Sequence, residues 1–80
     1  MPDGPLRARV PMPPDLREAL EAAGLTEAYA ARPPYQRNDY LGWITRAARP
    51  ATRAKRLDQM LREFAAGHGY MSMAWTPRDR

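Results

Sequence analysis

The fold is decided by residues 33–67, which read PPYQRNDYLGWITRAARPATRAKRLDQMLREFAAG. Apolar side chains recur there at helical spacing, first over residues 34–48 and again from residue 50 or 51 to 66. Pro50 separates the two segments, because the residue before a proline avoids the helical region while proline itself suits a first helical turn. Gly67 ends the second segment. Two amphipathic helices with so short a link predict an antiparallel helical hairpin.

Two shorter helices are expected before this hairpin. Pro14 opens the first, Asp15 complements the positive end of its dipole, and Gly24 ends it. Thr26 is the expected cap of the second, which ends before Pro33. The sequence therefore predicts a small all-α domain of three to four helices over residues 10–66, with a flexible arm at 1–9 and a flexible or loosely docked tail at 67–80. The expected core consists of Leu16, Leu20, Tyr40, Leu41, Trp43, Ile44, Leu57, Met60, Leu61 and Phe64.

Composition excludes several functional classes. The 80 residues include no cysteine, which rules out disulfides, thiolate metal sites and a cysteine nucleophile. A single histidine, His68, argues against a histidine-rich metal site and against a Ser-His-Asp triad. No apolar run approaches the roughly 20 residues of a membrane span, and the proline-rich start shows no signal sequence. We expect no catalytic residues, no metal, no cofactor and a cytoplasmic location.

The charge of the chain is unevenly distributed. The net charge is +4, and 12 of the 13 basic residues are arginine. Seven basic and three acidic residues fall within 34–66, giving that segment +4, whereas two basic and four acidic residues give 15–33 a charge of −2. The folded chain should therefore present a basic face, which favours anionic partners without specifying which.

An arginine-rich stretch, residues 46–56, spans the link between the two long predicted helices. Its functional interpretation is an anion or partner site at a helix N-terminus, where free amides and arginine forks favour phosphate or carboxylate. The alternative is a solvated corner. Arg53 stands apart because it begins the apolar stripe, so we expect it to pair with Asp39 or helix carbonyls, or to stack on a ring. The candidate binding residues are Arg46, Arg49, Lys55 and Arg56.

The two long predicted helices share a motif of side chains at fixed spacing. It reads Tyr-x-x-Trp-Ile, then alanines at the corner, then Thr-Arg-x-x-Arg. With this signature, residues 10–67 resemble the bacteriocin-protection, YdeI/OmpD-associated family. The resemblance implies a small helical bacterial or archaeal domain without an established catalytic activity. The family's name also points to protection against antimicrobial compounds and to envelope association. The signature residues are Tyr40, Trp43, Ile44, Ala47, Ala48, Thr52, Arg53 and Arg56. We expect a structural role for five of them, Tyr40, Trp43, Ile44, Thr52 and Arg53.

These features favour two functions from different classes. The first is a non-enzymatic helical interaction module that binds an unknown protein partner through the long helices or the apolar tail, which contains Tyr70, Met71, Met73 and Trp75. The alternative is a nucleic-acid-binding module that uses the basic face of the last two helices. Tyr40 and Trp43, one turn apart, fit a base-stacking pair as well as core packing, which is the more common role.

Overall fold

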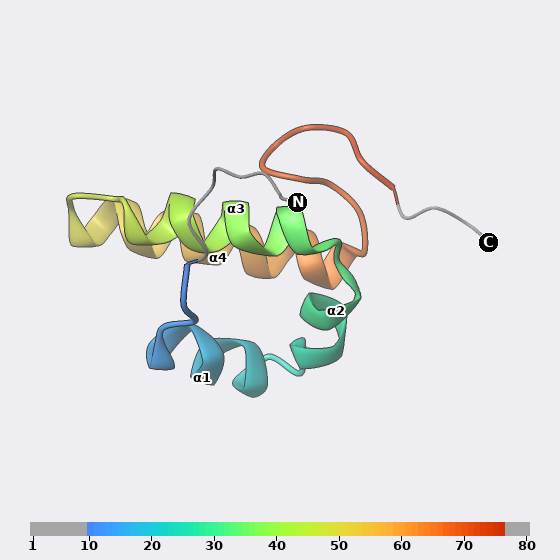
Figure 1. Ribbon diagram of the computed structural model, residues 1–80, viewed down its shortest axis with the longest axis horizontal. Coiled ribbons are helices and arrows are strands. Elements are labelled where there is room, and N and C mark those ends of the chain that lie inside the picture. Colours follow the sequence, from blue (N-terminus) through green and yellow to red (C-terminus); the bar gives the residue numbers. More distant parts are fainter. Residues whose placement is uncertain (1–9, 77–80) are drawn as a thin grey trace, which may run out of the picture.

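The computed structural model describes residues 10–76, which form four helices (Figure 1). They are α1 (Pro14–Ala22), α2 (Thr26–Ala31), α3 (Pro34–Thr45) and α4 (Pro50–Ala66). The helices α3 and α4 run antiparallel side by side, and α1 and α2 lie along one side of this hairpin (Figure 1). The all-α prediction and the C-terminal hairpin are therefore confirmed. The predicted arm at residues 1–9 lies outside the described residues.

Two predicted helix details are corrected by the structure. The third helix ends at Thr45 and not at Ala48, because the amide of Ala47 bonds back to Ile44, 3.3 Å away, and tightens the chain into a turn. The N-cap of α2 is Leu25 and not Thr26, since the Leu25 carbonyl accepts the first helical bond, from Tyr29 at 2.9 Å. No side chain caps that helix.

The core lies where α1 packs against the α3–α4 hairpin. Seven apolar side chains are buried in it, and all seven are predicted from the apolar stripes. Three further predicted members, Trp43, Leu57 and Leu61, are only partly buried and pack at its edge. The buried residues are Leu16, Leu20, Tyr40, Leu41, Ile44, Met60 and Phe64.

The segment after α4 folds back over the hairpin. Gly67 adopts a left-handed conformation, with φ of 81°, and ends the helix as predicted. Tyr70 and Met73 then exchange two main-chain hydrogen bonds, of 2.9 and 2.8 Å. The Tyr70 ring packs edge-on against the rings of Tyr35 and Tyr40. The amide of Gly69 donates to the carbonyl of Trp75 at 2.7 Å, and Trp75 is the last described residue with such a contact. The flexible or loosely docked tail over residues 67–80 stays a prediction.

Candidate functional site

The four predicted anion-binding residues do not converge on one point. Arg49 and Lys55 are exposed at the start of α4. Arg46 is also exposed, but its guanidinium lies back along α3 over Gly42, where a Cβ added to the glycine would stand 2.7 Å from Nη1. Arg56 donates from Nη1 to the main-chain oxygen of Trp43, 2.6 Å away, and its guanidinium lies 5.3 Å from the centre of the Trp43 ring. Arg56 is thus engaged within the hairpin.

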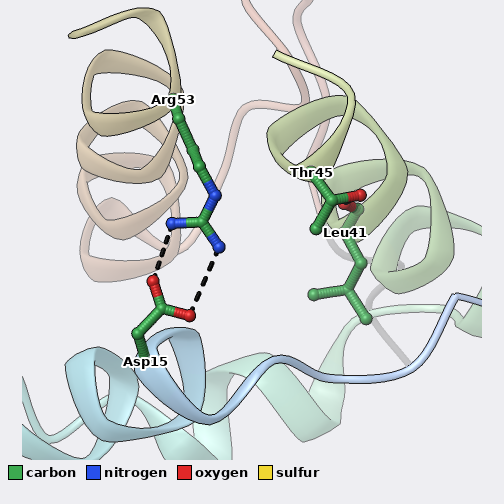
Figure 2. Close-up of polar contacts among 4 residues, drawn as sticks. All are labelled: Asp15, Leu41, Thr45 and Arg53. Carbon is green, nitrogen blue, oxygen red and sulfur yellow. Dashed lines mark hydrogen bonds and ion pairs between the residues drawn. The ribbon is translucent and has the colours of Figure 1, made fainter. Parts of the chain in front are cut away.

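Arg53 pairs with Asp15 and not with Asp39. Its two terminal nitrogens face the two carboxylate oxygens of Asp15 at 2.7 and 3.3 Å, linking α4 to α1 (Figure 2). The hydrogen bond from Arg53 lowers the pKa of Asp15 below its usual value. Asp39 instead accepts a hydrogen bond from the hydroxyl of Tyr70. The sequence predicts a paired Arg53 beside the apolar stripe of α4; the structure gives it a partner 38 residues away in the chain, at a substantially exposed contact.

The other signature residues lie at the contact between α3 and α4. Tyr40 and Ile44 are fully buried, and Thr52 is partly buried in the first turns of α4. Trp43 lies at the edge of the core, with its ring centre 6.2 Å from that of Tyr40 in an edge-on arrangement. A buried Tyr40 has no face open to solvent, which leaves Trp43 as the member of this pair that an external base could contact.

Arg32 is a buried cation that the sequence did not single out as a site residue. It is 5% exposed and donates to Oε1 of Gln36 at 3.1 Å and to the carbonyls of Gly69 and Glu63 at 2.6 and 3.1 Å. Its guanidinium lies between the rings of Phe64 and Trp75, 4.6 and 4.5 Å from their centres. The signal for this residue was its position directly after α2, three and four residues beyond the apolar Tyr29 and Ala28.

Glu63 is the centre of a second polar cluster. Its carboxylate accepts the hydroxyl of Tyr40 and the amides of Met71 and Ser72, at 2.9 and 2.8 Å for the amides. Burial raises the pKa of Glu63, but the hydrogen bonds from Tyr40, Ser72, Met71 and Gln59 outweigh it, so that the pKa lies below its usual value. Met71 and Ser72 both have positive φ, 50° and 74°, which aims their amides at the one carboxylate.

A groove runs between the first described residues and α3. Its volume is about 760 Å³. From residue 10 the chain runs from the hairpin to α1 (Figure 1), and the amide of Val10 donates to Oδ1 of Asn38 at 2.7 Å. On the far side, the guanidinium of Arg37 lies 6.0 Å from the centre of the Tyr29 ring. The groove is lined by Val10, Pro11, Met12, Tyr29, Pro34, Tyr35, Arg37, Asn38 and Leu41.

The groove combines an apolar surface with one cation whose hydrogen-bonding capacity is incomplete. Arg37 is the charged residue among its described lining, and the Nε of Arg37 is buried without an acceptor. Because Nε is enclosed, the groove offers an external group its apolar surface and the charge of the Arg37 guanidinium. An aromatic and aliphatic surface beside a guanidinium is suited to binding an apolar group that carries an oxygen acceptor. The sequence alone did not reveal this site, since residues 10–12 and α3 meet only in the folded chain.

Metal-binding and membrane-spanning features are absent from the described part of the chain. Residues 10–76 contain no group of three or more His, Cys, Asp or Glu arranged to hold a metal ion. Within the same residues, no helix combines the length and the apolar character that crossing a membrane requires.

A protein-family model matches most of the chain. The family model described as "Bacteriocin-protection, YdeI or OmpD-Associated" matches residues 9–67. That span contains all four helices and every residue of the signature. No curated protein and no solved structure matches the chain.

Proposed function

Since the chain belongs to the bacteriocin-protection, YdeI or OmpD-associated family, we propose that it is a non-enzymatic helical interaction module that binds a partner protein. The groove beside α3 is the observation that carries this proposal. It joins the N-terminal segment, α2 and α3, and Tyr35 at its border is 52% exposed. Exposed aromatic side chains next to apolar grooves are typical of the centres of protein interfaces.

The bonding of the polar residues supports the non-enzymatic part of the proposal. A general acid, base or nucleophile must reach a substrate. Tyr40, Glu63 and Arg32 carry the most elaborate hydrogen bonding in the described chain, and each is committed to holding the segment after α4. Their chemistry is therefore used in stabilising the fold.

Site-specific photo-crosslinking tests the proposed function. Benzoylphenylalanine replaces Tyr35 in one variant and Ala65, exposed on α4, in a control. Both are expressed in the native host and irradiated. We expect a discrete protein adduct from position 35 that position 65 does not give. The absence of an adduct at position 35, or identical adducts from both positions, would contradict the proposal.

Nucleic-acid binding is the second candidate function, favoured by the exposed start of α4. Arg49 and Lys55 are exposed there, and within residues 10–76 neither forms an ion pair. If this function is correct, short DNA or RNA should shift the amide resonances of these residues at about 50 mM salt and lose most of its affinity by about 200 mM. Unchanged spectra at the lower salt concentration would exclude it.

A further inference from the structure

We propose that the groove beside α3 binds an acidic peptide segment of the partner, with its carboxylates on Arg37 and Arg46 and its apolar side chains between them. This inference rests on the proposed function, because it specifies the chemistry of the partner at the same groove. Three properties of the groove lead to it: the positive charge of its described lining, its apolar side chains and the small number of free main-chain donors along one wall.

The described lining of the groove carries positive charge and no acidic side chain. Within residues 10–76, neither Arg37 nor Arg46 forms an ion pair. Asp39 lies two residues from Arg37 in sequence, but its carboxylate faces the hydroxyl of Tyr70. A carboxylate is the acceptor that best complements a guanidinium, because it forms two parallel charge-assisted bonds.

Arg46 extends this positive charge to the end of the groove near Val10. A Cβ on Gly42 would lie 2.7 Å from Nη1 of Arg46 and 3.7 Å from Cγ2 of Val10, so the two side chains border the same glycine. Val10 in turn lines the groove. Because Gly42 has no side chain, the guanidinium of Arg46 can lie against α3. The apolar side chains of the groove then separate Arg46 from Arg37.

The groove is suited to holding a peptide through the side chains of the peptide and not as an added β-strand. Pro11 and Pro13 have no amide hydrogen, and the amide of Val10 is already bonded to Asn38. The wall formed by residues 10–13 therefore has little main-chain capacity for β-augmentation. Aliphatic and aromatic side chains remain, and a volume of about 760 Å³ accommodates several of them. Because these walls are apolar, they favour a peptide over a phosphate backbone, which would need exposed cations along its whole path.

Peptide selection on the full chain tests the inference without knowledge of the natural partner. A phage library of random peptides, each roughly a dozen residues long to span a groove of this size, is selected on the immobilised protein. We expect the enriched sequences to combine Asp or Glu with Leu, Ile or Phe. A failure to enrich any peptide, or enrichment of neutral or basic ones, would overturn the proposal.

One enriched peptide is then synthesised and its affinity is measured by fluorescence anisotropy. We expect Arg37→Gln to weaken binding about tenfold, since it removes a charge-assisted contact. The matched control Arg62→Gln makes the same change in net charge at an exposed site on α4, and affinity should be unchanged. Equal affinities for the Arg37 variant and the unmodified chain would refute the assignment.

An NMR titration of the unmodified protein with the peptide locates the binding site from the shifts of the amide resonances. This measurement does not require a variant to fold. We expect shifts at residues 35–42 and none at 62–66; the reverse pattern would overturn the inference. If single-stranded DNA displaces the peptide and shifts the same amide resonances, the groove is a nucleic-acid site and the proposal is overturned. An adduct at position 35 without acidic peptide binding would refute the acidic chemistry alone and leave the proposed function standing.

Discussion

Tyr40 and Glu63 form a hydrogen bond across the contact between α3 and α4, 23 residues apart in the chain. The same carboxylate accepts the amides of Met71 and Ser72, and the Tyr40 oxygen also accepts the amide of Met71, at 3.0 Å. This pair therefore joins three segments at one point. It also explains how Met71 and Ser72 keep positive φ, which costs free energy for residues other than glycine.

Replacing Glu63 by glutamine should destabilise the fold and release the turn at residues 70–73. The amide side chain loses the charge and one acceptor, so one or both turn amides lose their partner. We expect the free energy of unfolding in urea to fall by about 1–2 kcal/mol. Hydrogen exchange of the Met71 and Ser72 amides should accelerate more than exchange within α1. Tyr40→Phe is the matched variant, and a double-mutant cycle with no coupling would contradict the pair.

Acid should destabilise the protein through the same carboxylate. The folded pKa of Glu63 lies below its unfolded value near 4.5, so its contribution is present above pH 4.5 and is lost as pH falls through the lower folded pKa. The stability of the Glu63→Gln variant should depend less on pH in this window. Equal pH dependence in urea unfolding curves of the two proteins would contradict the assignment.

High pH should destabilise the fold through ionisation of Tyr40. Burial, and then its bond to the carboxylate, raise the pKa of Tyr40 above the usual value of 10.0. Its contribution to stability is therefore complete below about pH 10 and is lost as pH rises toward the higher folded pKa. Urea unfolding between about pH 9 and 11 measures this loss, and the Tyr40→Phe variant should show less of it. A steeper loss in that variant would contradict the assignment.

Arg32→Lys should be strongly destabilising although the charge is kept. Lysine cannot reproduce the fork that reaches Gln36, Gly69 and Glu63, nor the stacking between Phe64 and Trp75. We expect a loss of about 2–3 kcal/mol in the free energy of unfolding, because buried acceptors lose their donors. Arg62→Lys, at an exposed position, should change stability by less than about 0.5 kcal/mol. Equal losses in the two variants would show that Arg32 has no special role.

Gly42→Ala should stabilise the protein. Alanine favours a helix interior over glycine by about 0.5–1 kcal/mol, and the nearest obstacle is the flexible end of Arg46, which can move outward. Gly67→Ala is the contrasting variant, since φ of 81° makes alanine strained there, and it should lower stability by about 1 kcal/mol. Thermal and urea unfolding of both variants test these opposite signs; destabilisation by Gly42→Ala would show that Arg46 cannot move away from Gly42.

Breaking the pair of Asp15 and Arg53 should have a small effect that depends on salt. Both side chains are substantially exposed, 56% and 31% respectively, so solvent and ions screen their attraction. Asp15→Asn and Arg53→Gln should each lower the melting temperature slightly at low salt, and the difference should vanish near about 1 M salt. A decrease that persists at high salt would show that the contact depends on packing and not on charge.

The helices were predictable because their signals are local. The apolar stripes, Pro14, Pro34 and Pro50 at first turns, and Gly67 at the end of α4 act within a few residues of chain. The seven buried apolar residues follow from the same stripes. The predicted end of α3 is wrong by three residues because the chain tightens there into a turn, a change that helical periodicity does not report.

The partners of the polar residues were decided by tertiary structure. Periodicity places Arg53 beside the apolar stripe of α4, but whether it meets Asp15 or Asp39 depends on how α1 packs against the hairpin. Periodicity likewise puts Arg56 on the flank of α4, and only the fold brings it to the Trp43 carbonyl.

The helical class, the hairpin and the family signature of this protein can be predicted from sequence, because each depends on residues close together in the chain. Which cations stay available depends on how the helices pack. The tertiary structure buried Arg32 between two rings, engaged Arg53 and Arg56, and laid Arg46 over Gly42. It also created the groove beside Arg37, since its walls come from segments 28 residues apart that meet only when the core closes.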